Sequence, residues 1–156
     1  MHTAFPTAGV RITVTNFVPT YKVPKDAQAA DYRSFFTTAT VKLISDADGL
    51  VTQAAEDAPL KVFPRAKVDF VFEVVNGRFA TDGRTYNPVG IGFFGQNGGV
   101  GIDDFPARTV SGDVFNRLLL RVHDANVHST SFKFSLLIQC EDTGELGVID
   151  PQVANG

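Results

Sequence analysis

Residues 132–141 alternate apolar and mostly polar side chains along their whole length, and this pattern constrains the fold more than any other part of the chain. The apolar positions of the segment are Phe132, Phe134, Leu136, Ile138 and Cys140. A period of two points successive side chains to opposite faces, so only a β-strand with one buried face satisfies it. Residues 117–123 alternate in the same way, and the polar residues 124–131 separate the two segments. We therefore predict two long strands joined by a loop.

Two further turn signals predict hairpins elsewhere in the chain. Residues 46–49, Asp-Ala-Asp-Gly, lie between two strand-like segments and are typical of a hairpin turn. The alternating residues 68–75 end at Asn76-Gly77. Both residues of that pair tolerate the positive φ of a type I′ turn, so Phe79 is expected on a return strand.

Short strands separated by turn signals, with no convincing helix, predict an all-β fold. We expect an antiparallel β-sandwich of about seven to nine strands, immunoglobulin-like or with Greek-key connections. A closed barrel is the alternative. The length of 156 residues suits one domain, so residues 1–156 are expected to form a single β-sandwich. The 14 phenylalanines, with no tryptophan, predict aromatic rings that interdigitate between two sheets.

Charge and composition exclude several classes of partner. The formal net charge is -3 and the 14 Lys and Arg residues are scattered, so no basic field is available for a nucleic acid. No run approaches the ~18 apolar residues of a membrane span, and residues 1–9 lack the apolar region of a secretory signal. We expect a soluble, cytoplasmic protein with neither a membrane nor a nucleic-acid partner. The single Cys140 excludes an internal disulfide, and its apolar face predicts an inert buried thiol.

The glycine-rich residues 95–112 form the least regular stretch, and three acidic residues flank or lie in it. These are Asp103, Asp104 and Asp113. Carboxylates beside exposed backbone carbonyls can hold Ca²⁺, so a lectin-like ligand-binding module that uses this loop is one hypothesis. A solvated loop whose acids improve solubility is the simpler interpretation, because the spacing is not diagnostic and no Asn or Glu ligand set accompanies it. No metal or cofactor is predicted.

Base, acid and hydroxyl side chains come close together in sequence only at the loop that joins the two long strands. The loop region contains His123, Asp124, His128 and Ser129. A hydrolase-type enzyme that uses His123 or His128 is therefore a further alternative. A catalytic serine needs a strained elbow and an oxyanion hole, and no Gly-x-Ser-x-Gly motif is present. We predict no catalytic residue and keep both histidines as candidate ligand-binding residues.

Short motifs in the C-terminal part of the chain resemble those of small bacterial proteins of the DP-EP family. The motifs are Leu118-x-Leu120-x-Val122-x-Asp124-x-Asn126, Phe132-x-Phe134-x-Leu136 and the ending Asp150-Pro151-Gln152-Val153-Ala154-Asn155-Gly156. Asn155-Gly156 stands where the family pattern has Glu-Pro. The resemblance implies a β-sandwich and supplies no activity and no catalytic residues.

Apolar side chains also occupy the strand faces that are expected to meet solvent. These residues are Val71, Val75, Leu119 and Leu137. Such residues need cover from a loop, a second sheet or a partner subunit, so we predict that they form a homo-oligomer interface. The first functional hypothesis is therefore a non-catalytic structural or interaction protein that self-associates. Its small-molecule ligand, if it has one, is not specified by the sequence.

Overall fold

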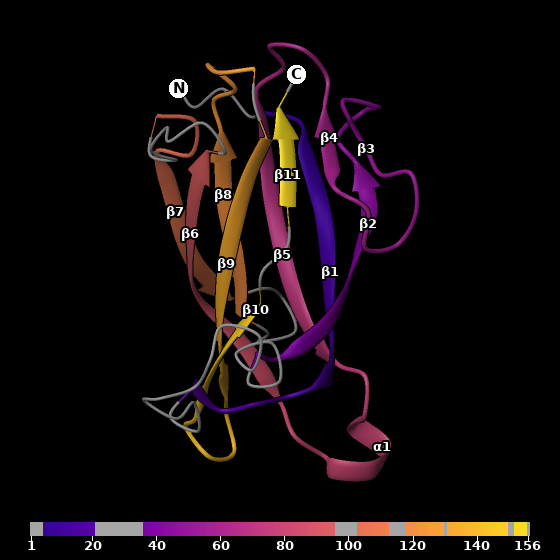
Figure 1. The fold of residues 1–156 in the computed structure, drawn as a ribbon, viewed down its shortest axis with the longest axis vertical. Coiled ribbons are helices and arrows are strands. Elements are labelled where there is room, and N and C mark those ends of the chain that lie inside the picture. Colours follow the sequence, from indigo (N-terminus) through magenta and orange to yellow (C-terminus); the bar gives the residue numbers. More distant parts are fainter. Residues whose placement is uncertain are drawn as a thin grey trace, which may run out of the picture.

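The chain is all-β apart from one helical turn in the computed structural model, which describes residues 5–20, 36–95, 103–112, 118–129, 131–149 and 152–155 (Figure 1). The described elements are β1 (Thr7–Asn16), β2 (Thr38–Asp46), β3 (Val51–Thr52), β4 (Leu60–Val62), β5 (Val68–Asn76), α1 (Phe79–Asp82), β6 (Tyr86–Gly95), β7 (Ala107–Gly112), β8 (Leu118–Asp124), β9 (Ser131–Cys140), β10 (Leu146–Ile149) and β11 (Gln152–Asn155). The all-β prediction is confirmed, with more strands than expected. The described helix is not long or apolar enough to cross a membrane.

The strands form two mixed sheets. The first sheet has the order β2-β1-β5-β8-β7. The second has the order β10-β9-β11-β4-β3. In it, β10 and β11 pair with different parts of one edge of β9, and β6 pairs with the opposite edge of β9. Two pairs are parallel, β1 with β5 and β4 with β11, so the sheets are not purely antiparallel as predicted. The chain leaves β1, builds β2, β3 and β4, and then returns to lie beside β1 in the same direction.

The two long strands predicted first are β8 and β9, and they lie in different sheets. The burial of β9 alternates as its sequence does, with Phe132, Phe134, Leu136, Ile138 and Cys140 all buried. In contrast, β8 pairs with β5 and β7 on the opposite side of the core. Residues 125–130 therefore carry the chain from one sheet to the other.

The two predicted hairpins are wrong: β5 is already paired on both of its edges, with β1 and with β8, and β3 pairs with β4 rather than with β2. After β5, Asn76 donates from Nδ2 to the Asp82 carboxylate at 2.7 Å and to the Arg84 carbonyl at 2.6 Å. It also accepts from the backbone N–H of Arg78 at 2.8 Å. These bonds close the turn around α1, which leaves Phe79 62% exposed rather than on a strand.

The outer edge of β2 is covered in a similar way by the segment that follows it. The Gln53 side chain accepts from the N–H of Leu43 at 2.8 Å and donates to the carbonyl of Val41 at 2.9 Å. The Asp57 carboxylate accepts from the N–H of Val41 at 2.6 Å. Two side chains thus occupy the place of a neighbouring strand, while β3 pairs with β4 instead. This edge of the first sheet is protected against pairing with another chain.

Phenylalanine rings connect the inner faces of the two sheets. Phe72 of β5 contacts Phe134 of β9 with ring centroids 5.4 Å apart, and Phe134 contacts Phe93 of β6 at 5.3 Å. Phe93 stacks on Phe105 at 3.7 Å, and Phe105 meets Phe132 edge-on at 5.2 Å. The prediction that aromatic rings interdigitate between two sheets is confirmed.

Candidate functional site

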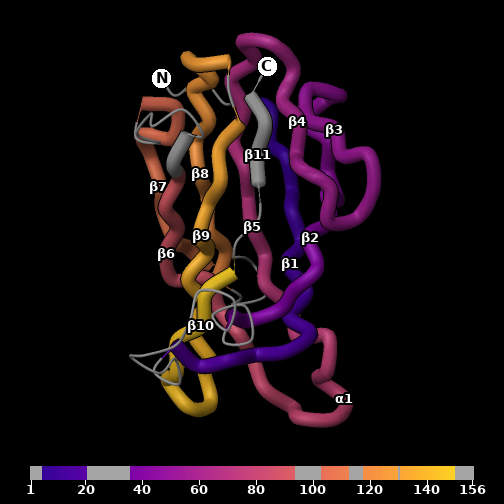
Figure 2. The backbone as a smooth tube through the Cα atoms, in the orientation of Figure 1, coloured from indigo at the N-terminus to yellow at the C-terminus, as the bar shows by residue number. Residues whose placement is uncertain are grey.

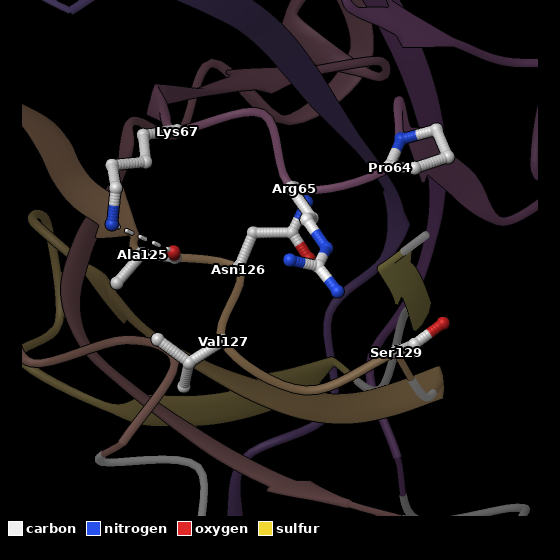
Figure 3. Close-up of a pocket in the computed structure, with 7 residues that line it drawn as sticks. All are labelled: Pro64, Arg65, Lys67, Ala125, Asn126, Val127 and Ser129. Atoms are coloured by element: carbon white, nitrogen blue, oxygen red, sulfur yellow. Dashed lines mark hydrogen bonds between the residues drawn. The ribbon is translucent and has the colours of Figure 1, made fainter.

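A cavity lies between two chain connections at one end of the molecule. One connection joins β4 to β5 and the other joins β8 to β9, and Figure 2 shows both at the same end of the two sheets. The cavity has a volume of about 570 Å³. The residues that line it are Pro64, Arg65, Lys67, Ala125, Asn126, Val127 and Ser129 (Figure 3). It therefore exists only because the fold brings two distant segments together.

Asn126 links the two connections by hydrogen bonds. Its Nδ2 donates to the carbonyls of Phe63 and Ala66, both at 3.1 Å. Its backbone N–H donates to the buried Asp124 carboxylate at 3.0 Å. The residue has a φ of 48°, a left-handed conformation that asparagine tolerates better than most side chains. The wall of the cavity is thus held by one side chain in a fixed orientation.

Two cations face the cavity. Nζ of Lys67 donates to the carbonyl of Ala125 at 3.4 Å, a long contact that leaves the ammonium two further donors. Arg65 has a φ of 59° and makes no hydrogen bond or ion pair with another described residue. Among the described residues that line the cavity, none is a carboxylate. The site is therefore positively charged.

The buried Asp104 carboxylate pairs with the exposed imidazole of His128 in the β8–β9 connection. Asp104 is fully buried, and its carboxylate accepts from the backbone N–H of His128 at 3.1 Å. Nδ1 of His128 lies 2.5 Å from the other carboxylate oxygen. The Asp104 backbone carbonyl also accepts from Ala125 at 2.6 Å. Asp104 thus holds the connection at two points, Ala125 and His128.

The hydrogen bond and the negative charge of Asp104 raise the pKa of His128 above its ordinary value. The folded pKa then lies above the unfolded value of about 6.5, so the stabilising interaction is complete below that value. It is lost as the pH rises through the folded pKa. We expect the Tm of the wild-type protein to fall as the pH rises from about 6.5 upwards for this reason. Differential scanning calorimetry across this range measures the effect.

An Asp104→Asn variant serves as the control for the pH dependence. The amide keeps most of the shape and removes the charge, so the pKa of His128 should return towards its ordinary value, which an NMR titration of the imidazole reports directly. A His128→Gln variant should lose the same part of the Tm dependence. If His128→Gln unfolds with the same dependence on pH as the wild type, the pair does not cause it.

The other predicted histidine belongs to a separate cluster on the outer face of the first sheet. Nδ1 of His123 lies 2.9 Å from Oδ1 of Asp69, and Arg121 donates to the same carboxylate at 3.2 Å. The ring of Phe5 packs on His123 with centroids 4.5 Å apart. The structure therefore gives each histidine its own carboxylate. Within the described segments, no hydrogen bond links either imidazole to the hydroxyl of Ser129, which faces the cavity.

The three acidic residues predicted around the glycine-rich loop do not share one environment. Asp103 is exposed, Asp104 is buried against His128, and Asp113 lies outside the described residues, as do residues 96–102. Residues 107–112 of the predicted loop form β7. In the part of the chain that the structure describes, no group of three His, Cys, Asp or Glu side chains is placed to hold a metal ion.

The predicted interface residues are divided between the two outer faces of the molecule. Val71, Val75 and Leu119 lie on the outer face of the first sheet. Leu137 lies on the outer face of the second sheet, paired with Val148 on one side and Gly90 on the other. All four are half-buried. They therefore cannot form one continuous patch.

Arg65 and Lys67 were not among the residues that the sequence singled out, and Asn126 was named only within the family-like motif, with no role assigned to it. Their only local signal is the basic pair after Pro64 and the asparagine in the β8–β9 loop. Neither signal identifies a site by itself, because each half of the cavity lacks the other until the chain folds.

Comparison with known proteins adds a likeness of fold. No protein-family model and no curated protein sequence matches the chain. Among solved structures, it is similar to an inclusion body protein, PixA, from Burkholderia cenocepacia J2315. The TM-score is 0.59, the identity is 7%, and the match covers 100% of this chain and 99% of that one. At this identity, the likeness concerns the fold.

Proposed function

We propose that the chain is a non-catalytic, cytoplasmic β-sandwich protein with Greek-key connections of the immunoglobulin-like kind, and that it self-associates. The observation that carries this proposal is the edge strand β7 of the first sheet. Within the described residues β7 pairs only with β8, and its side chains are almost all exposed, Val110 among them. An unpaired strand edge offers backbone donors and acceptors to a strand of another copy.

The contrast with the opposite edge supports the choice of β7. At that edge of the first sheet, Gln53 and Asp57 occupy the outer hydrogen-bonding groups of β2. In the second sheet, the edge strand β3 has only two residues. The β6 edge contains Pro88 and an irregular register at Gly90, features that disfavour pairing with a further strand. Among the edges of β2, β3, β6 and β7, that of β7 is the regular one to which the described residues give no such protection.

The similar fold of a protein named as an inclusion body protein also supports the proposal. That protein's name refers to inclusion bodies, and we take this as support for self-association of the present chain. The half-buried apolar residues on the outer face of the first sheet, such as Val71 and Leu119, are the alternative surface through which copies of the chain would meet instead. The β7 edge and this outer face therefore have to be tested against each other.

Sedimentation velocity of the full chain over a range of concentrations tests the proposal. We expect the mean mass to increase with concentration, and we expect Val110→Lys to weaken association by at least about tenfold. A lysine on an edge strand opposes pairing because the second strand would have to bury its charge. Thermal unfolding of the variant confirms that it remains folded.

The matched control is Val71→Lys, which places the same charge on the outer face of the first sheet. It should leave association close to that of the wild type. If Val71→Lys abolishes association and Val110→Lys does not, the contact lies on the sheet face and the role of β7 is wrong. A strict monomer at every concentration contradicts self-association altogether.

A further inference from the structure

We propose that the cavity between residues 63–67 and residues 125–129 binds a small organic anion that carries a hydroxyl group close to its charge. Sugar phosphates and hydroxy acids have this chemistry. The site is separate from the strand edge to which we assign self-association, so neither proposal depends on the other.

The charge of the cavity indicates an anion. Arg65 and Lys67 both line it, and among the described lining residues no carboxylate balances them. The guanidinium of Arg65 has no hydrogen-bond or ion-pair partner in the described part of the chain. A guanidinium presents a planar set of donors that matches a phosphate or carboxylate, and an ammonium adds a point charge. Both groups are therefore available to a ligand.

A buried acceptor in the wall indicates a donor on the ligand. Asn126 is only 6% exposed, and its Oδ1 has no hydrogen-bond partner among the described residues. Nδ2 of the same amide bonds two backbone carbonyls, which fixes which end of the group is the acceptor. Figure 3 shows this side chain pointing from the β8–β9 connection towards Arg65. Buried polar atoms of folded proteins nearly always have a partner, so a donor is expected here.

A bound water molecule would satisfy Oδ1 as well as a ligand hydroxyl does, but it would not use the charge of the exposed Arg65. An organic anion with an adjacent hydroxyl satisfies both groups together. The volume of about 570 Å³ suits a small molecule. Pro64 and the exposed side chain of Val127 add apolar surface for a carbon skeleton, and the Ser129 hydroxyl adds a further polar contact.

The test is an NMR titration of the full-length, ¹⁵N-labelled chain with four probes. Glycerol 3-phosphate and glycerate carry an anion and hydroxyls, inorganic phosphate carries the anion alone, and glycerol carries hydroxyls alone. We expect saturable shifts of the Asn126 side-chain amide with at least one of the first two probes. That probe should bind at least about tenfold more tightly than inorganic phosphate, and glycerol should cause no shift. The stronger of the two identifies whether the anion is a phosphate or a carboxylate.

Arg65→Gln is the variant that tests the assigned contact. Its side chain is exposed and has no described partner, so the fold should be retained, and binding should weaken by at least about tenfold. Arg78→Gln removes the same charge at the opposite end of the molecule, beside α1, and should bind as the wild type does (Figure 1). Equal binding by Arg65→Gln and the wild type overturns the proposal. So does the absence of a saturable shift with every anionic probe.

Discussion

Replacing Phe134 with alanine is expected to lower the free energy of unfolding by about 3–5 kcal/mol. Phe134 is fully buried and contacts Phe72 of the first sheet and Phe93 of the second. Its removal takes away a large apolar surface and leaves a cavity in the middle of the ring cluster, which the surrounding strands can fill only in part. A single domain is stable by about 5–15 kcal/mol, so at the lower end of this range the substitution removes most of the stability. Urea unfolding measured by circular dichroism gives the difference.

The control for Phe134 is Phe79→Ala on α1. The same side chain is removed there, but Phe79 is 62% exposed and contributes little to the core. Its free energy of unfolding should remain within about 0.5 kcal/mol of the wild-type value. If the two variants unfold at similar urea concentrations, the aromatic cluster does not hold the sheets together as the ring contacts indicate.

The second large effect is expected at Asn126, where alanine should cost about 3 kcal/mol. The substitution leaves the carbonyl of Ala66 without its side-chain donor and the carbonyl of Phe63 with only the N–H of Ala66, and unmade buried hydrogen bonds cost about 1–3 kcal/mol. It also places an alanine at a φ of 48°, which adds about 1 kcal/mol. Chemical denaturation of the purified variant measures the sum.

Asn126→Gly separates the two contributions at this position. Glycine adopts the left-handed conformation freely but has no side chain, so Asn126→Gly should be more stable than Asn126→Ala by about 1 kcal/mol. Asn16→Ala, at the exposed end of β1, is the matched asparagine control and should change the stability by less than about 0.5 kcal/mol. Equal stabilities of the alanine and glycine variants at position 126 would show that the backbone conformation carries no strain.

The failed hairpins show that the neighbours of a strand in the sheet decide whether the next segment can pair with it, since β5 already pairs with β1 and β8. Asn76-Gly77 is typical of a tight turn, yet the Asn76 side chain bonds the residues around α1 and the chain does not reverse beside β5. Residues 46–49 contain three consecutive positive φ angles, at Ala47, Asp48 and Gly49, but the following segment offers Gln53 and Asp57 side chains to β2 rather than a strand. A local signal predicts that the chain turns, but the available hydrogen-bond partners decide where it goes afterwards.

The sequence by itself determined that the chain is β-rich, because a period of two along residues 132–140 has one solution for a half-buried segment and the observed burial of β9 follows it. It also determined that phenylalanine rings fill the core. Only the tertiary structure decided the partners of each strand, the placement of β8 and β9 in different sheets, and the cavity. The bond from Asn126 to Phe63 joins residues 63 positions apart. Contacts at such separation depend on how the two sheets pack, which no local pattern of side chains encodes.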